Sequence, residues 1–303
     1  MLFETPVIFH SQGVPLVGRF LRTTESLDER QPAVIIVGSW LTVKEQMAVA
    51  YGRRLAEAGY AAFVFDFSGF GQSDGEPRQA EIPRRKIADI RAAAEYIQTV
   101  SFVDPASVGC VAICASAQYV LAALAEGAPI RSFASVAGWY HDLASLAPFY
   151  GGQAGVEQRL ERGREALDKY ARNRELVLAP AYADGDERAG MHFRLDYYAR
   201  PDRGAVPAWR NEMAEMTWFY WFTFNGLTAA DRVTTPALFV HSDGCVFPDN
   251  AKQVYARVKG PKELVWASGA QIDFYDQQEQ VEQALGAIRR WFERTIAGRP
   301  VAV

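Results

Sequence analysis

The feature that most constrains the fold is an apolar strand that passes directly into a helix. The strand pattern covers residues 108–113, and residues that favour helix follow at 115–124. Only a very tight turn can join the two, and Cys114 stands at its tip between the small residues Ala112 and Ser116. A side chain there projects above the sheet at a helix N-terminus, where free N–H groups favour an anion. The sequence therefore predicts that Cys114 is a nucleophile with a lowered pKa, and a buried structural cysteine is the alternative.

Strand and helix patterns alternate along most of the chain. An opening hairpin is followed by short apolar segments typical of buried strands, with helical patterns between them. Alternation of this kind predicts an α/β fold, with helices on both faces of a mostly parallel, eight-stranded sheet. The predicted strands are residues 2–9, 14–22, 33–37, 61–65, 108–113, 133–137, 236–240 and 263–267.

The alternation stops between residues 143 and 232. This segment has a charged helical pattern at 156–173 and an aromatic cluster at 218–224, with no clean strand pattern. We therefore predict an inserted helical cap at 143–232 and a core formed by residues 1–142 and 233–303.

Composition narrows the classes of partner. The net charge of −4 comes from mixed charges, so no basic stripe suits a nucleic acid. No apolar run has the length of a membrane span, and the N-terminal residues lack a signal-peptide pattern. Three cysteines, an odd number in a long chain, favour a reducing compartment. We expect a cytoplasmic protein that binds a small-molecule acyl substrate without cofactor, metal, nucleic acid or membrane, and a homodimer is left open.

The turn and its neighbours resemble the α/β-hydrolases, and within them the dienelactone-hydrolase-like branch that uses a cysteine nucleophile. The pattern small-x-Cys114-x-small matches the nucleophile elbow of that fold. Similar segments follow in the same order along the chain: residues 43–46, residues 66–73 with the pattern Asp-x-x-Gly-x-Gly-x-Ser, and residues 268–275. The resemblance implies an α/β-hydrolase fold whose oxyanion is held by the N–H of Ala115 and by the loop that contains Ser39 and Trp40.

The resemblance also implies a catalytic relay, and here the chain departs from the family pattern. Gln271 holds the position of the family's histidine after the last strand. The position of the family's acid, counted back from Pro248, falls on Gly244, and Asp243 lies one residue earlier. An amide cannot take up and release a proton at neutral pH, so the triad lacks its proton carrier and is degenerate. Hydrolysis of an acylated Cys114 then lacks a general base, which contributes roughly 10²–10⁴-fold in rate.

Another histidine could take the missing role. His141 follows the strand next to the turn, so its loop opens on the rim where such folds bind ligands. The alternative is that residues 139–142 only hold the hinge of the cap. The candidate catalytic residues are therefore Cys114, Gln271, Asp243 and His141.

Aromatic side chains are the candidate substrate-binding groups. Consecutive aromatic residues at 218–222 cannot all face one way on a helix, so some pack inside the cap and others line an apolar pocket. The candidates are Tyr140, Trp218, Trp221 and Phe247.

Three functions fit these features. The first is action on a small, largely apolar ester, thioester or lactone through Cys114, with hydrolysis as the reaction. The second is a non-hydrolytic reaction such as acyl transfer, cyclisation or elimination, where loss of the histidine protects the product from water. The third is ligand binding without catalysis.

Overall fold

One eight-stranded sheet forms the centre of the molecule. The computed structural model, which describes residues 1–296, orders the strands β1-β2-β4-β3-β5-β6-β9-β10. Pairs β1–β2 and β2–β4 are antiparallel, and the other pairs are parallel. This confirms the predicted α/β fold with a mostly parallel sheet. The strands are β1 (Phe3–Ser11), β2 (Val14–Arg22), β3 (Gln31–Val37), β4 (Ala61–Phe65), β5 (Val103–Ile113), β6 (Ser132–Val136), β9 (Ala237–His241) and β10 (Lys262–Trp266).

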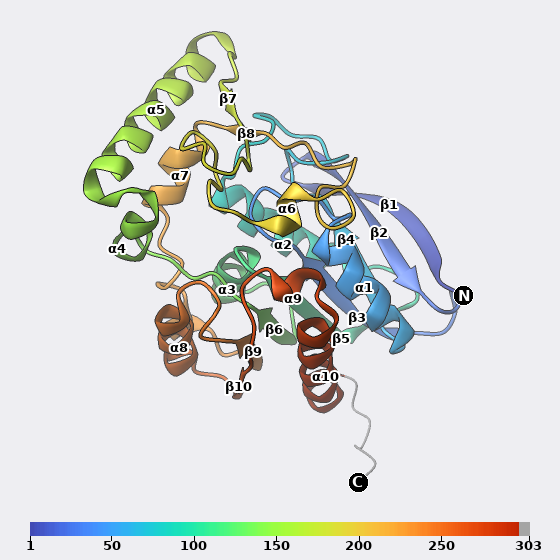
Figure 1. Ribbon diagram of the computed structural model, residues 1–303. Helices are drawn as coiled ribbons and strands as arrows, with labels where there is room; N and C mark the ends of the chain where they lie inside the picture. The colour runs from blue at the N-terminus through green and yellow to red at the C-terminus, as the bar shows by residue number, and fades with distance from the viewer. Residues whose placement is uncertain (297–303) are drawn as a thin grey trace.

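Helices cover both faces of this sheet. Helices α1 (Met47–Glu57) and α10 (Gln278–Thr295) pack together on one face, and α2 (Pro83–Ile97) and α3 (Ser116–Ala125) pack together on the other (Figure 1). Every residue of β4, β6 and β9 is buried as a result. This explains why the central strands have continuous apolar runs instead of an alternating pattern.

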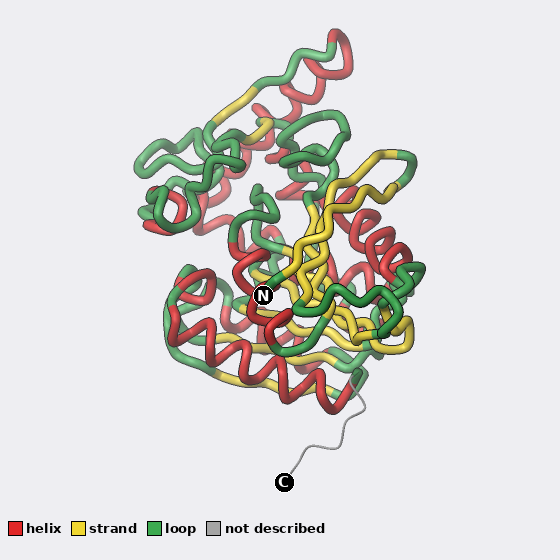
Figure 2. The backbone as a smooth tube through the Cα atoms, turned by 90° about the vertical axis from the view of Figure 1, so that its right-hand side faces the viewer, coloured by secondary structure: helices red, strands yellow, loops and turns green. Residues whose placement is uncertain are grey.

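Residues 143–232 contribute no strand to the eight-stranded sheet, as far as the structure describes the chain. They lie between β6 and β9 and gather at one end of the molecule, with α5 on the outside (Figures 1 and 2). The segment, called the cap below, contains α4 (Leu143–Leu146), η1 (Ala147–Tyr150), α5 (Gly152–Asn173), β7 (Leu178–Ala179), α6 (Asp196–Ala199), β8 (Met213–Ala214), α7 (Thr217–Thr223) and η2 (Ala230–Arg232).

The cap is not purely helical. Strands β7 and β8 pair in a separate antiparallel ladder that the sequence pattern does not predict, because each strand has only two residues. The last seven residues of the predicted core, 297–303, lie outside the described residues. Within the described part of the chain, no helix combines the length and apolar character of a membrane span.

Candidate active site

Cys114 occupies the turn that the sequence predicts. Strand β5 ends at Ile113 and α3 begins at Ser116. The φ angle of Cys114 is 57°, a left-handed conformation that side-chain-bearing residues rarely adopt and that marks stored strain. The backbone holds this conformation, because Cys114 N–H donates to Val136 O at 3.1 Å and Trp139 N–H donates to Cys114 O at 2.9 Å. The geometry matches a nucleophile elbow.

Four hydrogen-bond donors surround the thiol. Two are the backbone N–H groups of Ala115 and Trp40, and two are the hydroxyls of Ser39 and Tyr275. Burial nevertheless raises the pKa of Cys114 above its ordinary value, and the four donors offset only part of this effect. The predicted lowering of the pKa is therefore wrong, because removal of the thiolate from water outweighs the helix N-terminus.

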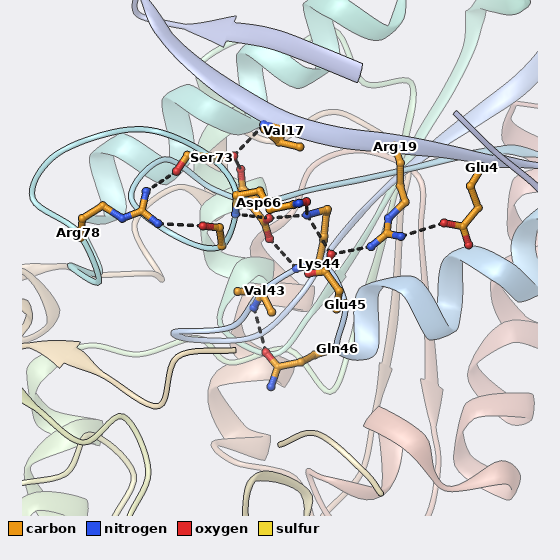
Figure 3. A network of polar contacts seen from close by, with 12 residues as sticks. Glu4, Val17, Arg19, Val43, Lys44, Glu45, Gln46, Asp66, Ser73 and Arg78 are labelled. Carbon is orange, nitrogen blue, oxygen red and sulfur yellow. Dashed lines mark hydrogen bonds and ion pairs between the residues drawn. The ribbon is translucent and has the colours of Figure 1, made fainter. Parts of the chain in front are cut away.

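Residues 38–46 form a loop, called the donor loop below because it carries Ser39 and Trp40, two of the four donors to the thiol. Buried charged side chains hold this loop in place. Lys44 Nζ lies 2.6 Å from Asp66 Oδ2, and both side chains are almost fully buried. Asp66 also accepts the Lys44 N–H, and its own carbonyl accepts the Ser73 hydroxyl at 2.6 Å (Figure 3). The segment from Asp66 to Ser73 thus braces the donor loop and holds the two loops together.

A second buried ion pair holds the same loop from the other side. Glu81 Oε2 lies 2.7 Å from Lys86 Nζ and accepts the N–H of Leu41 at 3.2 Å. The φ angle of Leu41 is 57°, again in the left-handed region. Because Leu41 directly follows Trp40, this contact fixes the peptide that leads out of Trp40, whose N–H faces the thiol.

Gln271 ties three loops together at the edge of the site. Its Oε1 accepts the N–H of Val246 at 3.0 Å, and its Nε2 donates to Ala137 O at 2.7 Å and toward the Tyr275 hydroxyl at 3.4 Å. The side chain lies on the wall of the pocket described below. An amide in this position orients its neighbours and transfers no proton.

The structure does not bring Asp243 to Gln271. The Asp243 side chain is 79% exposed and lies 3.7 Å from Lys252 Nζ. Gly244 forms a backbone bridge with Ala270, and a Cβ on Gly244 would lie 2.4 Å from Gly269 O. The position of the family's acid therefore accommodates only glycine, and Asp243 points into solvent.

His141 is not at the pocket either. It is fully buried, and its Nδ1 accepts the indole N–H of Trp139 at 2.8 Å. Since Nδ1 is an acceptor, the Nε2–H donates to Trp221 O at 3.0 Å. Burial lowers the pKa of His141 to about 3, so the ring is neutral at physiological pH. These contacts fit the alternative role, in which His141 holds the entry to the cap.

An apolar pocket of about 110 Å³ lies above the Cys114 thiol. A cavity of about 150 Å³ holds a benzene molecule, so this pocket suits a short acyl group. Its walls are mainly aromatic and come from the core loops and the cap: Trp40, Trp139, Phe149, Tyr198, Trp221 and Tyr275.

Of the predicted substrate-binding residues, only Trp221 lines this pocket among the described residues, where it stacks on Trp40 with ring centroids 4.6 Å apart. Phe247 packs against the wall residue Trp139, with ring centroids 4.9 Å apart. Trp218 packs within the cap against Phe222. The prediction for Tyr140 is not supported, because its hydroxyl donates to Ser135 Oγ at 2.8 Å in the core.

Three pocket tyrosines, Tyr150, Tyr198 and Tyr275, are absent from the sequence-based candidates. Tyr275 lies in α9 (Asp273–Asp276), four residues after Gln271, and the segment 268–275 that resembles the family contains it. That spacing could have drawn attention to it. Tyr198 lies in the four-residue helix α6, and no periodic signal marks it.

The fold is that of the α/β-hydrolases, and together with the comparisons below it identifies a hydrolase-fold enzyme that hydrolyses or transfers acyl groups. More particularly, a model of the Dienelactone hydrolase family matches residues 20–161. Uncharacterized protein YcjY of Escherichia coli K12 is 27% identical over 270 residues, which are 84% of this chain and 85% of that protein.

Acyltransferase drtE of Aspergillus calidoustus is 25% identical over 256 residues, which are 80% of each protein. The crystal structure of the α/β-hydrolase GrgF from Penicillium sp. sh18 superposes with a TM-score of 0.83 at 20% sequence identity, covering 97% of this chain and 99% of that one. At this identity the structural likeness supports the fold alone.

Proposed function

We propose that this protein is a cysteine-dependent acyl-transfer enzyme, which loads a small, largely apolar acyl group onto Cys114 and delivers it to an acceptor other than water. The observation that carries the proposal is the position of the thiol. It stands on a strained turn at the base of an apolar pocket, among four hydrogen-bond donors.

The acylation step uses the chain's own groups. The sulfur of Cys114 attacks the carbonyl carbon of an ester or thioester, and a C–S bond forms. The carbonyl oxygen takes the negative charge and is stabilised by the N–H groups of Ala115 and Trp40, which face the sulfur. The bond to the leaving group then breaks, and the departing alcohol or thiol carries away the thiol proton.

Release to water is expected to be slow. Among the described residues that line the pocket, the titratable ones are Cys114 and the tyrosines Tyr150, Tyr198 and Tyr275. Burial raises the pKa of each of these tyrosines, so none accepts a proton at neutral pH. A water molecule therefore has no base, whereas a better nucleophile such as a thiol or an amine needs less help. The relative named as an acyltransferase agrees with this preference.

A burst experiment tests the proposal. With p-nitrophenyl butyrate, we expect one equivalent of nitrophenol to form rapidly and further turnover to be slow, with a butyryl adduct on Cys114 in the intact mass. A thiol acceptor should then restore turnover. Cys114→Ala is the matched control and should give neither burst nor adduct. Fast hydrolysis by wild type would indicate an esterase, and the absence of any adduct would show that Cys114 is not a nucleophile.

A further inference from the structure

Two hydrogen-bond donors in the pocket walls lack a hydrogen bond of normal geometry within the described chain. They are the buried hydroxyl of Tyr198 and the buried indole N–H of Trp40. Both side chains line the pocket above Cys114, whereas the indole N–H of Trp221 has the Tyr150 hydroxyl as a partner. Buried donors are normally satisfied, so two in one pocket point to a ligand that supplies acceptors.

The Tyr198 hydroxyl is the donor whose position is best defined. Tyr198 is 3% exposed, and its hydroxyl interacts electrostatically with Cys114 and lies near the hydroxyls of Ser39 and Tyr275. It therefore faces the thiol and not the outer surface of the cap. A ligand atom that reaches it must lie close to the reacting carbonyl carbon.

The chemistry of the walls limits what that atom can be. Indole N–H groups only donate, so the matching atom is an acceptor. No Lys, Arg or His side chain lines the pocket among the described residues, and a carboxylate would be buried there without a counter-charge. The acceptor is therefore an uncharged oxygen. A carbonyl oxygen fits best, because it offers two lone pairs and no hydrogen.

We infer that Tyr198 forms a donor subsite for a second carbonyl oxygen on the acyl group, so that the enzyme selects short oxoacyl groups over their all-carbon counterparts. This inference rests on the proposed function, since it concerns the group that Cys114 accepts. It makes Tyr198 a specificity-determining residue contributed by the cap to a site in the core.

A pair of thioesters tests the inference. Acetoacetyl- and butyryl-N-acetylcysteamine have acyl chains of equal length and differ in a carbonyl at the third carbon. The second-order rate constant for acylation of Cys114 is measured for each by thiol release and intact mass, and each is divided by its rate constant with glutathione. We expect wild type to prefer the acetoacetyl thioester by roughly tenfold after this correction, the range of one hydrogen bond.

The variant Tyr198→Phe removes only the hydroxyl. It should abolish the preference by slowing the acetoacetyl reaction much more than the butyryl reaction, and it should not clearly lower the melting temperature, because the hydroxyl makes no hydrogen bond of normal geometry within the described chain. Tyr170→Phe removes a hydroxyl from a tyrosine of α5 in the cap, outside the pocket lining, and should keep the preference.

The outcomes separate the two proposals. Failure of both thioesters to acylate Cys114 would overturn the proposed function itself. Equal corrected rates in wild type, a preference that survives in Tyr198→Phe, or a clear loss of stability in that variant would overturn the subsite while acylation stands.

Discussion

At the scale of single residues, the thiol of Cys114 shows two opposing electrostatic effects. Burial disfavours the thiolate, and hydrogen bonds from Ser39, Tyr275, Ala115 and Trp40 favour it. Burial is the larger effect, so the folded protein holds less thiolate at neutral pH than a free cysteine does. The same donors are then available for the oxyanion that forms during acylation.

We predict a displaced pH profile for alkylation of Cys114 by iodoacetamide. Because the pKa is raised, the rate should be low at neutral pH and still rise at a pH where a free thiol has levelled off. Tyr275→Phe removes a donor to the thiolate and should move the profile further toward alkaline pH. Peptide mapping assigns the site, and Cys114→Ala is the blank. A plateau below the pKa of free cysteine would contradict the dominance of burial.

Gln271 is the second residue whose chemistry can be tested directly. Gln271→His places an imidazole at the pocket wall, where one nitrogen can donate to the Ala137 carbonyl and the other stays free to act as a base. We expect steady-state hydrolysis after the burst to rise by about tenfold, less than a full general base gives, because no acid orients the ring. Gln271→Asn is the matched control, because its amide cannot accept a proton from water. An equal gain in both variants would mean that the amide's bracing role, not proton transfer, limits turnover.

The family's acid cannot be restored in the same way. A Cβ on Gly244 would lie 2.4 Å from Gly269 O, a backbone atom that cannot move independently of its loop. Gly244→Asp should therefore destabilise the protein by about 1–3 kcal/mol and add nothing to the activity of Gln271→His. Urea unfolding of the single and double variants measures the cost. A stable double variant with faster hydrolysis would show that the loops after β9 and β10 separate easily.

At the scale of elements, burial explains which parts of the structure could be read from the sequence. The eight strands follow from apolar runs, and their predicted bounds differ from the observed ones by at most two residues except at β5, which begins at Val103. The turn at Cys114 follows from a strand that meets a helix without a spacer. These features depend on neighbours along the chain, which a sequence displays.

The remaining parts depend on contacts between distant segments. His141 has the right position in sequence for a base, but its burial and its bonds to Trp139 and Trp221 are set by the fold of the cap. Tyr198 comes to the thiol from a four-residue helix within an irregular stretch. Hydrophobic periodicity cannot reveal either placement, because neither residue lies in a long regular element.

The donor loop shows how an element can depend on a remote ion pair. Glu81→Gln leaves Lys86 buried without its counter-charge, and we expect a loss of about 3–5 kcal/mol in the free energy of unfolding. The double variant Glu81→Gln/Lys86→Met removes both charges and should recover most of that loss. Urea unfolding of wild type, the single variant and the double variant measures these free energies of unfolding. A loss below about 1 kcal/mol in the single variant would show that water reaches the pair.

At the scale of the whole molecule, the cap closes over the thiol through polar contacts with the core. Arg203 of the cap forms two bonds to the carboxylate of Asp276, at 2.6 and 2.5 Å. Nearby, Trp209 Nε1 donates to Leu41 O at 2.8 Å, which ties the cap to the donor loop. Cys114 is only 4% exposed beneath this cover. We expect a bulky substrate to reach the sulfur only when the cap moves, and the Arg203–Asp276 pair is a contact that such a movement would break.

We predict that Asp276→Asn speeds access to Cys114 without changing its chemistry. The variant weakens a bidentate ion pair whose side chains are 15% and 23% exposed, so alkylation of Cys114 by a bulky maleimide should become several-fold faster. Alkylation by the small iodoacetamide should change less, because it needs a smaller opening. Asp231→Asn breaks a surface pair with Arg257 away from the pocket and should leave both rates unchanged.

Salt of about 1 M should raise the rate of maleimide alkylation in wild type and have little effect on that rate in Asp276→Asn. Equal rates in all three proteins would show that access is controlled elsewhere, for example by the contact between Trp209 and Leu41.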